Sequence, residues 1–149
     1  MNNWFFWAYI LFAFDRITKY TAHTYLSTQD YIFNTYVTGT YVINTGLSYG
    51  LFSPEKAKHF WFLTGIIVLV TIILFFYWRR KKDVISALSV GLFLVNVGSF
   101  GNIVDRILYK GVVDWIYVHY THYALPVFNC ADVYICIGAL LITFAYARD

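Results

Sequence analysis

Long stretches without a charged side chain constrain this chain more than any other feature. Residues 59–78 and 84–104 contain no Asp, Glu, Lys or Arg, and residues 126–147 contain only Asp132. A helix needs roughly 20 apolar residues to cross the hydrocarbon core of a bilayer. Only 13% of the residues are charged, whereas soluble domains carry about 25%. The sequence therefore predicts a mostly α-helical, polytopic membrane protein.

Residues 4–23 are a fourth candidate span with a less regular pattern. Eleven apolar residues are followed by Asp15-Arg-Ile-Thr-Lys19. A cleavable signal peptide is the alternative, but the stretch lacks a basic beginning and places charges where an apolar core or cleavage site should be. We therefore expect four transmembrane helices in one membrane domain (residues 1–149), with outer segments at 24–58 and 105–125.

A short basic run predicts the orientation of these spans. Arg79-Arg-Lys-Lys82 lies between the second and third spans, and dense basic loops are typically cytoplasmic. Both termini are then cytoplasmic, and the two outer segments lie on the other side. Because four of the eleven basic residues belong to this run, the net charge of +3 does not indicate a nucleic-acid partner.

The outer segments have the composition of strands. Residues 31–43 are rich in β-branched and aromatic residues, which predicts a small hairpin or sheet at the membrane surface with Thr38-Gly39 as its turn. Residues 111–118 have a similar composition and predict either a further strand or a helix lying on the surface.

Two aspartates, Asp114 and Asp132, lie where spans meet the outer water layer. A carboxylate in hydrocarbon costs about 2.5–3.5 kcal/mol, so it persists mainly where it has a function. Two adjacent carboxyl groups share one proton. The ionised one then accepts a proton from an attacking water while the other protonates a carbonyl oxygen. This chemistry requires neither a metal nor a cofactor. The alternatives are a solvated loop residue for Asp114 and a structural carboxylate for Asp132.

Further polar side chains lie near this pair in the predicted helices. Helical spacing places Asn102, Asp105 and Arg106 on one face, and Asn129 on the face of Asp132. The first three either converge on the protein interior, or Asp105 and Arg106 form an ion pair that ends the helix at the interface.

Two more groups precede the second span. Asp15 and Lys19 are four residues apart, which predicts an ion pair, with Arg16 reaching toward the interface. In Asn44-Thr-Gly-Leu-Ser-Tyr-Gly50, Gly46 permits a turn at the membrane surface. Asn44 is equally suited to binding the main chain of a substrate or to stabilising its own loop.

In combination, these segments resemble motifs of the bacterial lipoprotein signal peptidase (signal peptidase II) family, in order along nearly the whole chain. The matching segments are Asp15-Arg-Ile-Thr-Lys19, Asn44-Thr-Gly-Leu-Ser-Tyr-Gly50, Gly98-Ser-Phe-Gly-Asn-Ile-Val-Asp-Arg106, Gly111-Val-Val-Asp114 and Phe128-Asn-Cys-Ala-Asp132. The chain departs from the family at Arg16, at Leu47-Ser48 and at Ser99, where the family usually has Gln, two alanines and Gly.

The resemblance implies a membrane aspartic peptidase of the bacterial inner membrane. Such an enzyme removes the signal peptide from lipid-modified prolipoproteins, cutting before the cysteine that carries the diacylglyceryl group. It further implies a small outer β-sheet cradle, a short surface helix, an active site near the outer face, contact with membrane lipids and a monomer. The implied catalytic pair is Asp114 and Asp132, supported by Asn44, Gly46, Asn102, Asp105, Arg106, Asn129, Asp15 and Lys19.

Two other classes of function fit parts of the pattern. An ion- or proton-coupled transporter needs acids near the bilayer midplane, but residues 59–78 and 84–104 contain none. A non-catalytic membrane protein that binds lipoproteins fits the aromatic surface, although the presence of both aspartates argues against it.

Overall fold

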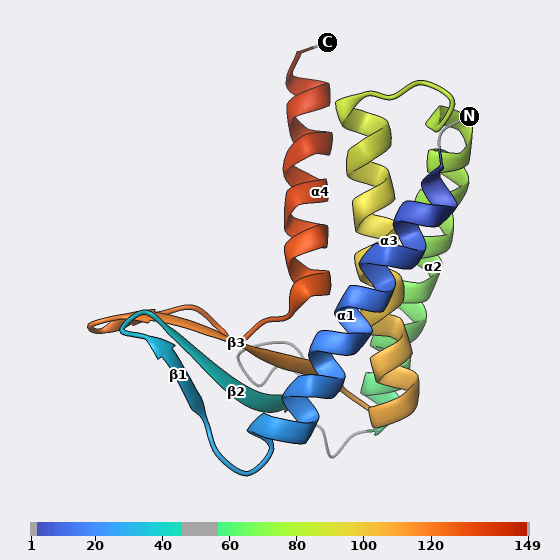
Figure 1. Cartoon of the computed structure of the whole chain (residues 1–149). Coiled ribbons are helices and arrows are strands. Elements are labelled where there is room, and N and C mark those ends of the chain that lie inside the picture. The colour runs from blue at the N-terminus through green and yellow to red at the C-terminus, as the bar shows by residue number, and fades with distance from the viewer. Residues whose placement is uncertain (1–2, 46–56, 149) are drawn as a thin grey trace.

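The computed structural model describes residues 3–45 and 57–148, which form four long helices and a small antiparallel sheet (Figure 1). The termini lie at one end of the helical bundle and the sheet lies at the other. The helices are α1 (Trp4–Leu26), α2 (Ala57–Lys81), α3 (Ala87–Tyr109) and α4 (Cys130–Ala147). The strands are β1 (Tyr31–Asn34), β2 (Val37–Asn44), β3 (Val112–Tyr120) and β4 (Tyr123–Ala124), which pair in that order.

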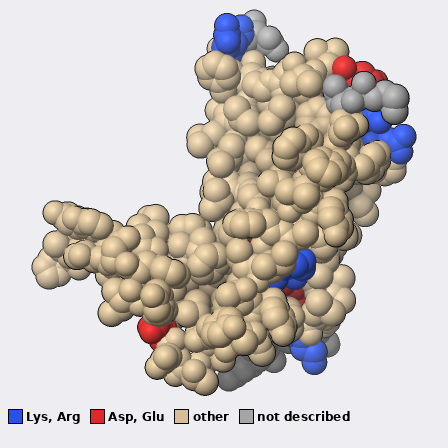
Figure 2. Space-filling model, viewed as in Figure 1, with Lys and Arg blue, Asp and Glu red and all other residues tan. Residues whose placement is uncertain are grey.

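Three of the helices confirm the apolar stretches of the sequence. His59–Lys81 of α2, together with α3 and α4, is long and apolar enough to cross a membrane. Helix α1 is long enough as well, but Asp15, Arg16 and Lys19 interrupt its apolar sequence. Figure 2 shows that charged side chains occupy only a few small patches of the visible surface, as expected of a surface that faces lipid.

Helix α3 is the centre of the bundle and packs most extensively against α4. Glycines bring the two backbones together: a Cβ atom built on Gly91 would lie 2.7 Å from the carbonyl oxygen of Gly138, and one built on Gly138 would lie 2.6 Å from that of Gly91. Close approach through small residues is typical of helices that associate in membranes, where no hydrophobic effect draws them together.

At the end of the bundle that carries the termini, aromatic residues connect α1 to α2 and α3. The ring of Trp4 packs edge-on against Trp78, with 5.8 Å between centroids, and lies 4.9 Å from the ring of Phe93. The indole N–H of Trp4 also donates to the carbonyl oxygen of Lys82 at 2.9 Å. These contacts fix the beginning of α1 beside the end of α2.

The predicted hairpin forms, but the prediction of its turn is wrong. The side-chain oxygen of Asn34 accepts hydrogen bonds from the backbone N–H groups of Tyr36 and Val37, at 2.8 and 3.0 Å. The chain therefore turns between β1 and β2 directly after Asn34, and Gly39 lies within β2. A Cβ atom on Gly39 would lie 2.9 Å from Cε2 of Phe33, so this glycine serves close packing rather than a turn.

The element bounds differ from the predicted spans at both ends of the outer segment 105–125. Helix α3 continues beyond residue 104 to Tyr109 and ends at Lys110, whose left-handed backbone (φ 55°) redirects the chain into β3. Helix α4 begins at Cys130 rather than near Pro126. Residues 111–118 lie in or next to β3, which decides between the two predicted alternatives in favour of a strand. The described parts of the outer segments contain no separate surface helix, and residues 46–56 lie outside the described part of the chain.

Candidate active site

Asp114 and Asp132 come from different elements and meet at Asn129. The side-chain amide of Asn129 donates to Asp114 Oδ1 at 2.6 Å, and its backbone N–H donates to Asp132 Oδ2 at 3.1 Å. Asp114 is almost fully buried in β3, whereas Asp132 is half-buried in the first turn of α4. One residue therefore binds both predicted catalytic carboxylates.

Backbone pairing places the two carboxylates beside each other. The segment before α4 runs antiparallel to β3: the N–H of Phe128 donates to the carbonyl oxygen of Ile116, and the carbonyl oxygen of Phe128 accepts from the N–H groups of Trp115 and Ile116, at 2.8–3.0 Å. Asn129 follows this pairing as the N-cap of α4, and its side-chain oxygen accepts from the N–H of Asp132 at 3.0 Å. The reciprocal hydrogen bonds form a capping box.

Every oxygen of the two carboxylates has a hydrogen-bond donor. Asn102 Nδ2 donates to Asp132 Oδ1 at 2.8 Å, and Asn44 Nδ2 donates to Asp114 Oδ2 at 3.0 Å. The side-chain oxygen of Asn102 in turn accepts from Asn129 at 3.3 Å. Three asparagines thus hold the pair in one arrangement, as an active site requires of groups that must keep their geometry.

The surroundings of Asp114 favour its protonated form. Burial, above all, and the nearby charge of Asp132 raise its pKa, while hydrogen bonds from Asn44 and Asn129 and the charge of Lys19 lower it; the net effect is a rise from 3.8 to about 6. A carboxyl group with its pKa near the working pH is suited to general acid–base catalysis.

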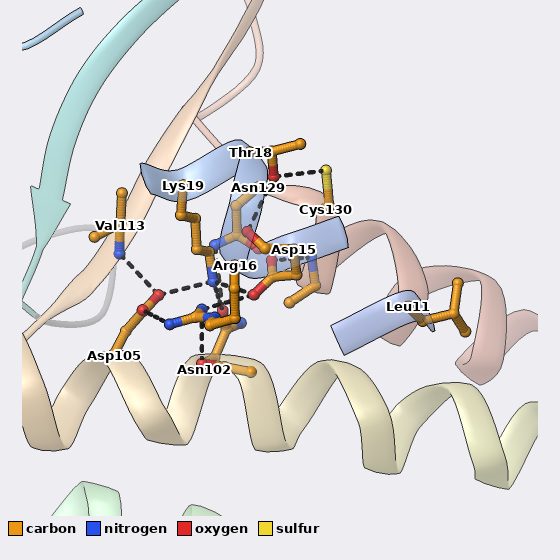
Figure 3. Close-up of polar contacts among 12 residues, drawn as sticks. Leu11, Asp15, Arg16, Thr18, Lys19, Asn102, Asp105, Val113, Asn129 and Cys130 are labelled. Carbon is orange, nitrogen blue, oxygen red and sulfur yellow. Dashed lines mark hydrogen bonds and ion pairs between the residues drawn. The ribbon is translucent and has the colours of Figure 1, made fainter. Parts of the chain in front are cut away.

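Next to the pair lies a cluster of four charges, which we call the charge cluster: Asp15, Arg16, Lys19 and Asp105 (Figure 3). Asp15, Lys19 and Asp105 are buried, whereas the side chain of Arg16 is 23% exposed. Arg16 contacts one oxygen of each aspartate at 2.6 Å. Lys19 Nζ lies 3.1 Å from Asp15 and 2.7 Å from Asp105, and it donates to Asn102 at 3.0 Å. Two anions and two cations balance, and the three protons of the ammonium group have three acceptors.

The charge cluster also positions the backbone of the candidate site. Asp105 Oδ2 accepts from the N–H of Val113 at 3.2 Å, and Asp15 Oδ1 accepts from the N–H of Ala131 at 3.1 Å. Val113 directly precedes Asp114, and Ala131 directly precedes Asp132. Each carboxylate of the cluster therefore fixes the residue before one member of the pair.

The structure confirms some predictions about this region and corrects others. Asp15 and Lys19 form the predicted ion pair. Arg16 does not reach toward the interface but turns inward to Asp15, to Asp105 and to the carbonyl oxygen of Gly101 at 3.1 Å. The residues that follow Arg16 in the sequence, Ile17 and Thr18, did not indicate that its side chain would point inward.

Of the two alternatives for this face of α3, the one in which Asp105 forms an ion pair with Arg106 is wrong. Consecutive helical residues point about 100° apart, and Asp105 is occupied by Arg16 and Lys19. Arg106 Nη1 contacts the carbonyl oxygen of Asn102 at 3.4 Å and lies within electrostatic reach of Asp132 and Asp114. Gly46 lies outside the described residues.

Within residues 3–45 and 57–148, no group of three His, Cys, Asp or Glu side chains is arranged to hold a metal ion.

Comparison with known proteins agrees with this arrangement. The family model described as signal peptidase (SPase) II matches residues 7–148. A lipoprotein signal peptidase of Blochmanniella pennsylvanica is 32% identical over 152 residues, which cover 99% of this chain and 90% of that protein.

Two solved structures, both described as a bacterial membrane enzyme, match over the whole chain. One has 29% identity and a TM-score of 0.76, with 90% of its own chain covered. The other has 25% identity and a TM-score of 0.78, with 95% covered. The match of sequence and fold extends across both halves of the candidate site, and the chain belongs to the signal peptidase II family.

Proposed function

We propose that this chain is a membrane-embedded aspartic endopeptidase that removes the signal peptide from diacylglyceryl-modified prolipoproteins, cutting before the lipidated cysteine. Asp114 and Asp132 are its catalytic pair. The observation that carries the proposal is the contact of Asn129 with both carboxylates, because it brings two acids from separate elements to one place.

The pair acts with one shared proton, since two adjacent carboxylates do not both ionise at neutral pH. The ionised member takes a proton from a water molecule as the water oxygen attacks the carbonyl carbon of the scissile bond. The protonated member donates its proton to the carbonyl oxygen. The proton taken from water then passes to the leaving nitrogen, while the other carboxylate takes a proton back from a hydroxyl of the tetrahedral intermediate. The C–N bond breaks, and the pair again holds one proton.

The supporting residues hold this geometry. Asn102 and Asn129 keep both carboxylates oriented, and Asn44 approaches Asp114 from β2. Arg106 stabilises negative charge near the pair. Asp15 and Asp105 act through backbone contacts, and Lys19 acts through the side chain of Asn102, rather than on the substrate. Gly46 belongs to the proposed supporting set, although it lies outside the described residues.

Helix α1 is proposed as the fourth span. Asp15 and Lys19 face the interior and are paired there, whereas Phe5 and Phe6 are 76% and 57% exposed and suited to lipid. A helix of 23 residues is about 35 Å long, which is enough to cross the hydrocarbon core. Because the charged side chains of α1 are neutralised within the protein, they do not prevent insertion of this helix into the membrane.

We place this single membrane domain, residues 1–149, in the bacterial inner membrane with both termini in the cytoplasm. The basic run Arg79–Lys82 supports this orientation, which puts the sheet and the catalytic pair near the outer face. The enzyme acts as a monomer among membrane lipids. The acyl chains of the substrate lie in the bilayer beside the spans, so that much of the binding free energy comes from apolar contacts remote from the bond that is cut.

A transporter is less compatible with the site. An ion path needs charged groups that can exchange partners along the membrane normal, whereas Asp15, Lys19 and Asp105 are bound to one another in one compact cluster. A non-catalytic lipoprotein-binding role makes a different prediction from the peptidase, which the following experiment distinguishes.

The test uses the purified protein in lipid with a diacylglyceryl-modified precursor and its unlipidated counterpart. Only the lipidated precursor should be cut. Asp114→Asn and Asp132→Asn should each reduce cleavage at least about 100-fold, because each removes a proton-transfer group. Asp30→Asn, which changes an exposed acid, is the matched control. Cleavage at the normal rate by either Asp114→Asn or Asp132→Asn would exclude the aspartic mechanism. Binding of the lipidated precursor without cleavage by the unmodified protein would favour the non-catalytic role.

A further inference from the structure

A groove in the surface of the molecule lies away from the proposed catalytic pair. It is a groove of about 800 Å³ between α1 and α2, with α3 as its floor. Its lining is almost wholly apolar and includes Ala8, Phe12, Ile72, Phe75, Phe93 and Val97. The rings of Phe12 and Phe100, with 5.3 Å between centroids, lie between this groove and the charge cluster. The groove is therefore separate from the candidate active site.

The opposite end of the groove lies under positive charge. Trp4 and Trp78 line this end, and the last turn of α2 continues from Trp78 with Arg79, Arg80 and Lys81, which are all exposed. Lys81 is three residues after Trp78, so the two side chains share one side of the helix. The exposed Asp83 is the one acid of the adjoining loop. Figure 2 shows this basic patch at the upper right of the molecule.

An apolar groove beside a basic patch has the two parts that an anionic phospholipid requires. The groove opens on helix surfaces that face hydrocarbon, where an acyl chain is the molecule available to fill it. Basic residues at the end of a transmembrane helix attract anionic headgroups. The basic patch lies close to the groove, because its residues directly follow Trp78, which lines the groove, along α2.

We propose that this groove, which we call the α1–α2 groove, holds one acyl chain of an anionic phospholipid whose phosphate is bound by Arg80 and Lys81. The site lies in the leaflet opposite the catalytic pair and takes a phosphodiester lipid with a net negative headgroup. It does not depend on the proposed peptidase activity, because no residue of the catalytic pair or of the charge cluster lines it.

The test measures which phospholipid the purified full-length protein retains. The protein in mild detergent is mixed with equal amounts of phosphatidylglycerol and phosphatidylcholine of identical chains, and bound lipid is counted by native mass spectrometry. We expect retention of one phosphatidylglycerol, at least about tenfold over phosphatidylcholine. The double variant R80Q/K81Q should lose this preference, whereas R148Q, which neutralises a cation at the end of α4, should keep it.

A second pair of variants tests the groove itself. Ala8→Phe adds a ring inside the groove and should reduce retention of phosphatidylglycerol at least about fivefold. Leu140→Phe changes an exposed position of α4 and should leave retention unchanged. Arg80 and Lys81 are exposed, so the charge variant should fold normally and remains decisive if Ala8→Phe does not fold. Equal retention of the two lipids by the unmodified protein, or an unchanged preference in R80Q/K81Q, would overturn the proposal.

Discussion

Replacing Lys19 by methionine removes one charge of the charge cluster while keeping an unbranched apolar side chain. Lys19 is only 4% exposed, and its ammonium group lies within 3.1 Å of Asp15, of Asp105 and of the side-chain oxygen of Asn102. The variant leaves two buried carboxylates with a single cation, Arg16. We therefore expect a large loss of stability together with a loss of order at Asn102.

The magnitude follows from the burial of the cluster. Removal of one partner from a buried ion pair costs about 3–5 kcal/mol, because the remaining charge stays in a region of low dielectric constant. For a protein of this size, each kcal/mol lowers the melting temperature by about 2–4 °C. Lys19→Met should therefore melt about 6–20 °C below the unmodified protein.

Restoring neutrality should recover part of this loss. In the double variant Lys19→Met/Asp105→Asn, the remaining charges are Asp15 and Arg16, which already lie 2.6 Å apart. The double variant should be more stable than the sum of the two single changes allows, because residues within one ion-pair network are not energetically additive.

The assay is thermal unfolding in a fixed detergent, with cleavage of the lipidated precursor measured on the same samples. Arg148→Gln is the control for loss of a cation outside the cluster, and it should change the melting temperature by less than about 2 °C. If Lys19→Met melts within about 2 °C of the unmodified protein, or if the double variant shows simple additivity, the cluster does not stabilise the protein as argued.

Three further predictions concern the pair, the helix cap and the helix interface. Because the pKa of Asp114 is raised from 3.8 to about 6, the stability that its proton contributes to the folded protein is present below pH 3.8 and is lost as the pH rises through 6. The difference in melting temperature, Asp114→Asn minus the unmodified protein, should therefore increase between pH 4 and pH 7. A decrease would contradict the raised pKa. Asn129→Ser should keep the cap of α4 and be about 1 kcal/mol more stable than Asn129→Ala, but neither variant should cleave substrate, since both lose the donor to Asp114; equal melting temperatures would argue against the cap. Gly138→Val should lower the folded yield, because its Cβ would meet Gly91, whereas Gly65→Val, where no atom lies within 4 Å of an added Cβ, should not.

Features that depend on long local stretches could be predicted from the sequence. The apolar runs at 59–78, 84–104 and 126–147 identify α2, α3 and α4 because the length of a span is a local property. The strands in the outer segments follow from runs of β-branched and aromatic residues. Helix ends and turns were less predictable: α4 begins at Cys130 rather than near Pro126, because Phe128 pairs with Ile116 of β3, and such distant pairing leaves no local pattern.

The types of residue in the sequence were enough to predict which residues belong to the candidate site, but less often which other residues each of them contacts. The i, i+4 spacing of Asp15 and Lys19 was sufficient to predict an ion pair, since both lie on one helix. Asp105, however, has potential partners on other helices, and the contact with Arg16 is determined by how α1 packs on α3. Arg16 was expected to reach toward the interface, and no local pattern indicated its contact with Asp105.

The position of the charge cluster explains why α1, the proposed fourth span, tolerates three charged residues. Asp15 binds the N–H of Ala131 and Asp105 binds that of Val113, so the cluster connects α1 and α3 to the beginning of α4 and to β3. A purely apolar packing would join the same elements but would allow them to slide, because apolar contacts lack direction. Directional bonds to the residues before Asp114 and Asp132 fix the separation of the two carboxylates. Stability and the geometry of the proposed catalytic pair therefore depend on the same four side chains, and a variant that weakens the cluster should lose activity before it unfolds.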